Sequence, residues 1–287
     1  MSQFVLAAQL YTIREFARTV DDFRSSMKKI REIGYTAVQV SGIGPIPDAT
    51  VKAIVDDAGL TICNTHVRPA DALWNDLDAV IAQHNLWDCK HVAIGSMPGR
   101  FREDGKAGFE RFAEQASRIG EKLHAAGLTF SYHNHSFEFA RFGSRNSDSA
   151  RNSDSVRNSD SARYSDSVRY SDSARTGLDI IYEESDPRYL QAELDTYWVQ
   201  HGGGDPVVWI DKMKNRMPVV HLKDMVIFDG EQAMAEVGEG NLNWPAILRA
   251  CREAEVEWYA VEQDVCRRDP FESLKISYEN LKLMGLE

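Results

Sequence analysis

The feature of this chain that most constrains its fold is a regular alternation of short apolar runs with amphipathic helical segments. The apolar runs lie at residues 4–9, 37–40, 61–65, 91–94, 129–133, 191–195, 219–222 and 258–262. The helical segments lie at residues 20–33, 49–58, 72–83, 109–126, 178–184, 206–214, 244–254 and 271–284. Strands that alternate with helices pair in parallel, so eight such units predict an α/β fold, a closed (β/α)8 TIM barrel. A doubly wound open sheet is the alternative, but no Gly-x-Gly-x-x-Gly motif opens a helix.

A low-complexity insertion interrupts the alternation between strand 5 and helix 5. Five hexapeptides of the type Arg-Asn-Ser-Asp-Ser-Ala follow one another from residue 145, and the insertion spans residues 144–175. One alanine or valine per repeat buries too little apolar surface to offset the entropy of ordering, which predicts a mobile loop. Because this junction lies on the C-terminal face of a barrel, a lid over the active site is the alternative. The remaining length of about 255 residues suits a single barrel domain over residues 1–287.

Charge and cysteine content exclude several classes of protein. The net charge is -11 and the sequence pI is about 5.3, without the basic stripe of a nucleic-acid-binding protein. No apolar run approaches the roughly 18 residues that cross a bilayer, and no convincing signal peptide begins the chain. The cysteines lack CxxC spacing, which indicates reduced thiols and a cytoplasmic protein. We therefore expect neither a nucleic-acid partner nor a membrane, whereas a homo-oligomer stays open.

Polar residues gather at the C-terminal ends of the expected strands. Alternate residues of a strand point to opposite sides, so side chains at i and i+2 share a side. The pairs that share a side are His133 with His135, Glu193 with Asp195, His221 with Lys223, and Glu262 with Asp264. Several carboxylates buried together are costly unless a cation neutralises them. Imidazole and carboxylate ligands suit Mn²⁺, Co²⁺, Zn²⁺ or Mg²⁺, so the pattern predicts one divalent metal ion.

Each of these residues also has a structural interpretation. A lone histidine at a strand end is more often a hydrogen-bonded structural residue than a metal ligand. Asp195 alone could cap the next segment, Glu262 alone could pair with a lysine, and Lys223 either binds a substrate oxygen or pairs with Asp224. Convergence of all of them on one face of the barrel favours a functional site.

Other residues at the strand ends are candidates for binding substrate. Three aromatic residues, Tyr11, Trp198 and Trp244, either line the expected pocket or pack in the core. The full set of substrate-binding candidates is Gln9, Tyr11, Asn64, Trp198 and Lys223.

Several of these segments together resemble the sugar phosphate isomerase/epimerase group of the xylose isomerase-like TIM-barrel superfamily. They are Gln-Leu-Tyr-Thr at 9–12, Tyr-His-Asn-His at 132–135, Ala-Glu-Leu-Asp-Thr-Tyr-Trp at 192–198, His-Leu-Lys-Asp at 221–224, Val-Gly-Glu-Gly-Asn-Leu at 237–242 and Glu-Gln-Asp at 262–264. The resemblance covers nearly the whole chain except the hexapeptides. It implies a metal-dependent enzyme of carbohydrate metabolism.

The resemblance also implies a set of metal ligands. Asp195, His221 and Glu262 match ligand positions of the superfamily on strands 6, 7 and 8. The ligand from strand 5 is commonly a glutamate, and this chain has His133 there. That departure puts a scheme with two opposed glutamate bases in doubt.

The remaining acid or base is therefore sought among nearby residues. Glu262 is the expected first catalytic residue, and His135, His66 or Lys223 is expected to act as the second.

The leading hypothesis is an isomerase or epimerase that acts on a ketose or keto-sugar. A metal-polarised carbonyl acidifies the neighbouring C–H bond and stabilises an enediolate, and reprotonation then isomerises or epimerises the sugar. The first alternative is a lyase or dehydratase of a keto-sugar or keto-inositol, similar to an inosose dehydratase. The second is a non-catalytic sugar-binding barrel. DNA-repair endonucleases of the superfamily need a basic groove, which this acidic chain does not predict.

Overall fold

The structure is a computed structural model that describes residues 4–143 and 175–286. Its described residues form a closed barrel of eight parallel strands, in the order β1-β12-β9-β8-β5-β4-β3-β2. These strands are β1 (Val5–Gln9), β2 (Ala37–Val40), β3 (Thr61–His66), β4 (His91–Ile94), β5 (Thr129–His133), β8 (Gln191–Asp195), β9 (Val219–Leu222) and β12 (Trp258–Val261). The barrel closes where β1 pairs with β12, with Val5 opposite Trp258. The predicted (β/α)8 barrel is confirmed.

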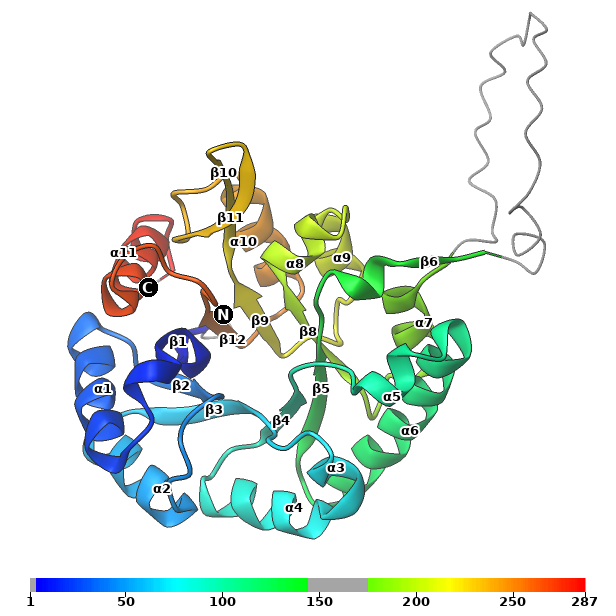
Figure 1. Ribbon diagram of the computed structural model, residues 1–287, viewed down its shortest axis with the longest axis horizontal. Coiled ribbons are helices and arrows are strands. Elements are labelled where there is room, and N and C mark those ends of the chain that lie inside the picture. Colours follow the sequence, from blue (N-terminus) through cyan, green and yellow to red (C-terminus); the bar gives the residue numbers. More distant parts are fainter. Residues whose placement is uncertain (1–3, 144–174, 287) are drawn as a thin grey trace, which may run out of the picture.

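Helices surround the strands, as Figure 1 shows. The longer ones are α1 (Val20–Ile33), α2 (Asp48–Asp57), α4 (Leu77–Leu86), α6 (Gly105–Ala125), α7 (Gly177–Glu184), α9 (Pro206–Lys212), α10 (Trp244–Glu253) and α11 (Pro270–Leu283). In α1, Thr19 caps the first turn by accepting from the backbone N–H of Asp22, and Gly34 ends the helix with φ of 126°. None of the helices in the described residues is long and apolar enough to cross a membrane.

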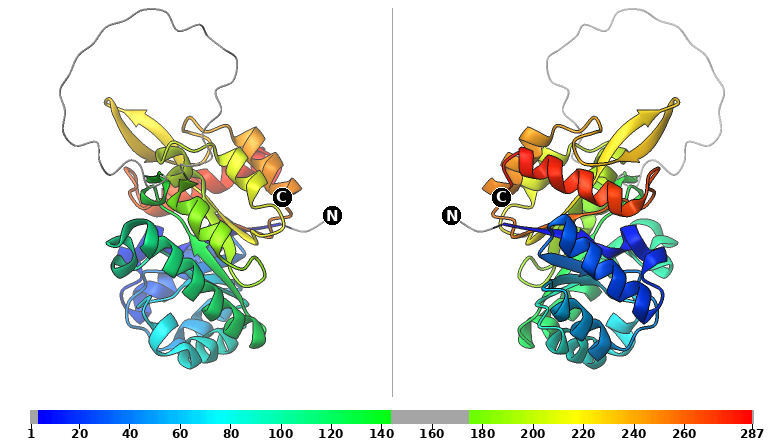
Figure 2. Two further views of the ribbon diagram at one scale, coloured as in Figure 1. Left: turned by 90° about the vertical axis from the view of Figure 1, so that its right-hand side faces the viewer. Right: turned by 90° about the vertical axis from the view of Figure 1, so that its left-hand side faces the viewer.

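The structure differs from the sequence prediction in several short elements. The helix predicted at residues 72–83 is divided into α3 (Ala72–Asn75) and α4, because Asp76 between them has φ of -151° and ψ of 55°. Sequence patterns also did not predict the helices η1 (Leu10–Phe16), η2 (Phe137–Phe139), α5 (Gly99–Arg102) and α8 (Thr196–His201). A hairpin of β10 (Asp224–Phe228) and β11 (Glu231–Ala235) projects from the barrel, as Figure 2 shows.

The described residues on either side of the hexapeptides lie between β5 and α7. The short strands β6 (Arg141–Phe142) and β7 (Arg175–Thr176) flank the hexapeptides and pair antiparallel, with Phe142 opposite Arg175. The mobile loop predicted for residues 144–175 lies, except for Arg175, outside the described residues.

Small side chains fill the barrel interior below a layer of polar side chains. Ala7, Ala37, Val219 and Ala260 pack together and are fully buried. Each of these residues is followed, two positions later, by a polar residue. In the same order, these are Gln9, Gln39, His221 and Glu262. Because side chains alternate along a strand, both sets share a side. The larger apolar core includes residues of both the strands and the helices.

Candidate active site

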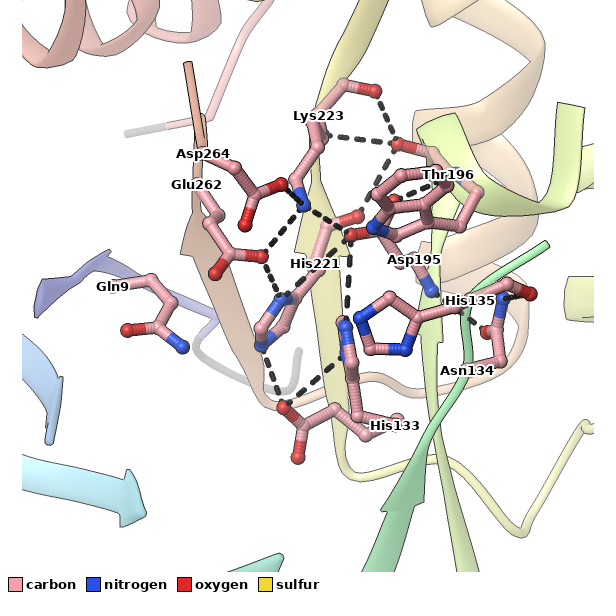
Figure 3. Close-up of polar contacts among 12 residues, drawn as sticks. Gln9, His133, Asn134, His135, Asp195, Thr196, His221, Lys223, Glu262 and Asp264 are labelled. Carbon is pink, nitrogen blue, oxygen red and sulfur yellow. Dashed lines mark hydrogen bonds and ion pairs between the residues drawn. The ribbon is translucent and has the colours of Figure 1, made fainter. Parts of the chain in front are cut away.

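A cavity of about 540 Å³ opens at the C-terminal ends of the strands. Its polar lining includes Tyr11, His66, His133, His135, Glu262 and Asp264. This is the end of a (β/α)8 barrel where active sites are found. Figure 3 shows the polar contacts of the side chains gathered there.

The four predicted metal ligands lie together at this end of the barrel. The candidate ligand atoms of His133, Asp195, His221 and Glu262 all lie within 4.8 Å of one another. Asp195 Oδ2 is 3.9 Å from His133 Nε2 and 4.0 Å from His221 Nδ1. Ligands at about 2.0–2.2 Å from a common ion stand roughly 3–4 Å apart, so this spacing fits a metal ion.

The two oxygens of Asp195 have different surroundings. Oδ1 accepts from the backbone N–H of Trp198 at 2.9 Å and so caps α8, as the structural interpretation of Asp195 predicted. Oδ2 is buried, lies 2.9 Å from Lys223 Nζ and is turned toward His133 and His221. One oxygen therefore holds the carboxylate in place while the other faces the ligand group.

Lys223 contributes a buried ammonium group beside the ligands. Its Nζ is 2.9 Å from Asp195 Oδ2, 2.8 Å from Glu262 Oε2 and 2.6 Å from Asp264 Oδ2. Its side chain is fully buried. The suggested pairing of Lys223 with Asp224 is therefore wrong, because Lys223 pairs with the three carboxylates of the site instead.

The site carries more negative than positive charge. Within the described residues, the carboxylates of Glu193, Asp195, Glu262 and Asp264 surround Lys223 and His221. Burial lowers the pKa of His221, but Glu193 and Glu262 outweigh it and raise the pKa to about 10. Burial, together with the charge of Glu262, raises the pKa of Asp195 to about 6 in spite of Lys223. A divalent cation fits this donor set because it would neutralise the excess charge.

A second cluster lies deeper in the barrel, around Glu193. Its carboxylate is 2.8 Å from His66 Nε2 and 2.6 Å from His221 Nε2. It also accepts from the side-chain amides of Gln39 at 2.7 Å and Asn64 at 2.6 Å. Four nitrogen atoms at hydrogen-bond distance already surround the two oxygens of Glu193. We therefore interpret this cluster as a hydrogen-bonded network, although it too could offer metal ligands.

His135 stands on the wall of the cavity as a neutral imidazole. Burial, reinforced by the charge of Lys223, lowers its pKa to about 4. Its ring lies 5.3 Å from that of Trp198, and its Nδ1 lacks a hydrogen-bond partner among the described residues. Such a group is free to exchange a proton with a ligand in the cavity.

The predicted substrate-binding residues fall into two groups. Tyr11 lines the cavity, with the guanidinium of Arg14 4.3 Å from its ring centre. Gln9 and Asn64 are fully buried. Their side chains contact neighbouring side chains, so direct contact with substrate stays a prediction for them.

Asp224 and the segment at residues 237–242 have a structural role. The Asp224 carboxylate accepts from the backbone N–H of Gly238 at 2.9 Å and of Gly240 at 3.0 Å. The indole of Trp244 donates to the same carboxylate at 2.5 Å and is buried. The suggestion that Trp244 lines the sugar pocket is therefore wrong, because its polar edge is turned to Asp224.

Three residues of the site were not among the predicted functional residues. Glu193 and Asp264 each share a strand side with a predicted ligand, so alternation along the strand was a signal for both. Gln39 gave a weaker signal, because it lies inside the apolar run at residues 37–40 and Ser41 is the one polar residue that shares its side.

Comparison with known proteins agrees with this geometry. A sequence profile of the xylose isomerase-like TIM barrel family matches residues 27–282. The chain belongs to this family. Comparison with curated proteins gives no match.

Several solved structures are similar to this one. A sugar phosphate isomerase/epimerase from Parabacteroides distasonis has a TM-score of 0.74 at 22% identity, covering 100% of this chain and 96% of that chain. An L-ribulose 3-epimerase has a TM-score of 0.64 at 14% identity, covering 98% of this chain and 94% of that chain. A probable 3-DHS dehydratase from Bacillus anthracis has a TM-score of 0.66 at 11% identity, covering 97% of this chain and 99% of that chain. At these identities the likeness establishes a shared fold.

Proposed function

We propose that the protein is a divalent-metal-dependent isomerase or epimerase of a ketose or keto-sugar. The observation that carries the proposal is the buried group of His133, Asp195, His221 and Glu262, whose candidate ligand atoms lie within 4.8 Å of one another. The same group opens on a cavity of about 540 Å³, a size suited to a small polyhydroxylated ligand. The excess of carboxylates over buried cations supports a divalent ion at this position.

A bound divalent ion supplies Lewis-acid polarisation of a carbonyl and stabilises negative charge on its oxygen. The side chains of the chain itself then bind and orient the sugar and move its protons. Lys223, held by three carboxylates, keeps its positive charge because burial lowers its pKa less than these carboxylates raise it. It therefore adds a fixed positive charge beside the reacting oxygen rather than a base.

Glu262 and His135 are the proposed pair of acid–base groups. Glu262 follows β12 and His135 follows β5, and β9 and β8 stand between these two strands in the barrel. Epimerisation requires removal of a proton from one face of a carbon and delivery of a proton to the other, so one of the two groups must take up a proton before the sugar reacts. His66 has both ring nitrogens in contact with protein side chains, Nδ1 with Gln9 and Nε2 with Glu193, and is less suited to that exchange.

A lyase or dehydratase of a keto-sugar is the second candidate, and one observation favours it. His133 stands on β5, where the resembling enzymes commonly have a glutamate, and among the described residues Glu262 is the one glutamate that lines the cavity. Elimination needs a base that removes a proton and an acid that protonates the leaving group, and a single carboxylate such as Glu262 can do both by passing on the proton that it has removed.

Hydrogen exchange with solvent deuterium tests the proposal. The metal-free protein, reloaded with Mn²⁺, is incubated in D₂O with a panel of ketoses and keto-sugars, and products are followed by NMR. We expect metal-dependent deuterium incorporation next to the carbonyl, with an inverted or isomerised sugar as product. Loss of water or of an alkoxy group would instead establish the lyase. No exchange with any sugar, with or without metal, would contradict both.

The variant Glu262→Gln removes a carboxylate that is proposed both as a base and as a metal ligand, so it is compared with the wild type at saturating Mn²⁺. Its side chain keeps nearly the same volume, and exchange should fall at least about 100-fold, as for loss of a general base. Glu257→Gln, in which the replaced side chain is half exposed, is the matched control and should exchange like the wild type.

A further inference from the structure

We propose that Glu193 is a positioning residue that fixes the ring of His221 and thereby presents its Nδ1 to the divalent ion. This inference rests on the proposed function, because it assumes that His221 is a metal ligand. Glu193 is fully buried and stands two residues before Asp195 on β8. It does not line the cavity, so its effect would pass through the side chains that it touches.

The hydrogen bonds around Glu193 determine which nitrogen of His221 carries a hydrogen. An ionised carboxylate only accepts, so Gln39 must turn its NH₂ group toward Glu193, at 2.7 Å. The carbonyl oxygen of Gln39 then faces His221 Nε2 at 2.7 Å, and Glu193 Oε1 faces the same nitrogen at 2.6 Å. Both neighbours of Nε2 are acceptors, so Nε2 holds a hydrogen and cannot bind a metal ion.

The other nitrogen of His221 faces the ligand group. Nδ1 is 2.9 Å from Glu262 Oε2 and 4.0 Å from Asp195 Oδ2. It is therefore the nitrogen that an ion bound by these carboxylates would meet. A carboxylate that holds the far N–H of a ligating histidine fixes the orientation of the ring and makes the ligand more basic.

His66 gives an independent check on the direction of these hydrogen bonds. Gln9 uses its carbonyl oxygen to accept from the backbone N–H of Tyr11 at 2.8 Å, which leaves its NH₂ group toward His66 Nδ1 at 3.4 Å. His66 Nδ1 must then accept, so Nε2 carries the hydrogen and donates to Glu193 at 2.8 Å. Both histidines that contact Glu193 thus donate to it, which agrees with a carboxylate that accepts and binds no metal.

The variant Glu193→Gln tests this role through metal binding rather than turnover. The metal-free protein is titrated with Co²⁺, and binding and ligand geometry are followed by the visible absorption bands. We expect one Co²⁺ per chain in both proteins, an affinity about 10- to 100-fold weaker in the variant, and shifted bands. Glu236→Gln is the control, since Glu236 is also buried but bonds Ser273. It should bind Co²⁺ like the wild type.

A second variant keeps the test decisive if Glu193→Gln does not fold. Gln39→Met removes the carbonyl that accepts from His221 Nε2 but keeps Glu193, so a smaller loss of affinity, several-fold, is expected together with shifted bands. Unchanged affinity and spectrum in both folded variants would overturn the inference. Two Co²⁺ ions in the wild type and one in Glu193→Gln would also overturn it, because Glu193 would then be a ligand. A wild type that binds no Co²⁺ would instead refute the metal site itself.

Discussion

The two ends of the barrel hold cavities of similar size but of different chemistry. The C-terminal mouth encloses about 540 Å³ and the N-terminal base about 470 Å³. At the mouth, Lys223 contacts three carboxylates within 3 Å. At the base, the titratable lining residues are His91, His124, Arg188 and Glu255, and His91 Nε2 lies 3.8 Å from a carboxylate oxygen of Glu257. The site is therefore marked by the convergence of charged groups and not by the volume of the cavity.

The difference follows from how parallel strands are built. Side chains at the C-terminal ends of the strands point into the mouth, and polar residues stand there two positions after small apolar ones. At the base, the barrel strands begin with residues that carry no carboxylate: Val5, Ala37, Thr61, His91, Thr129, Gln191, Val219 and Trp258. The carboxylates at the mouth are buried together, and a bound cation would lower the cost of burying them. The base holds no such group of carboxylates among the described residues.

The largest expected effect is the loss of a proposed metal ligand at the mouth. Asp195→Asn removes a charge that would face the proposed ion, and metal affinity measured by calorimetry should fall by more than about 100-fold, since loss of an outer partner alone costs 10- to 100-fold. Gln191→Ala, at the base of the same strand, is the control and should bind metal like the wild type. Equal affinity in Asp195→Asn would remove the main distinction between the two ends.

Removing the ammonium at the mouth should cost stability. Lys223→Met leaves three carboxylates without their buried partner, and the free energy of unfolding of the metal-free protein in urea should fall by about 3–5 kcal/mol. Divalent metal should restore part of this loss, because a cation again stands beside the carboxylates. A change of less than about 0.5 kcal/mol, with no effect of metal, would show that Lys223 is not held as described.

His91, at the N-terminal end of the barrel, should make the stability of the protein depend on pH. Burial lowers the pKa of His91 from 6.5 to about 4, so the unfolded chain binds more protons than the folded one below pH 6.5. Stability should therefore decrease as the pH falls from about 6.5 toward 4, by up to about 1.4 kcal/mol per pH unit from this group. His91→Gln should show a shallower decrease in urea unfolding between pH 7 and 5. Identical slopes in both proteins would contradict the assignment.

The smallest effect is expected from the insertion. Phe142 pairs with Arg175, so deletion of residues 145–174 leaves Gly143 and Ser144 as a two-residue hairpin turn. The free energy of unfolding and the metal affinity should both change little, by less than about 0.5 kcal/mol. A large change in sugar KM with unchanged stability would instead support a lid.

The sequence predicted the barrel well because the fold depends on periodic patterns. Each strand and the main helices came from apolar spacing, which local physics imposes. The division at Asp76, the helix after Asp195 and the hairpin β10–β11 were not predicted, because they depend on backbone angles, caps and pairing that no periodicity records.

The sequence predicted which residues come together in the site, but not which of them form hydrogen bonds and ion pairs with one another. Alternation along the strands brought His133, Asp195, His221 and Glu262 to one face, as found. The alternation did not predict that Lys223 pairs with Asp264 and not with Asp224. It also did not predict that Glu193 accepts hydrogen bonds from Gln39 and His66. Those contacts join residues far apart in the chain, and their partners are set by the closure of the barrel.

Anomalous diffraction from crystals soaked in Mn²⁺ tests the central claim most directly, because it locates the ion at either end of the barrel. We predict one peak per chain at the mouth, bound by His133, Asp195, His221 and Glu262, and no ion in the cavity at the base. No peak at the mouth with saturating Mn²⁺, or a peak among the residues around His91, would contradict the account.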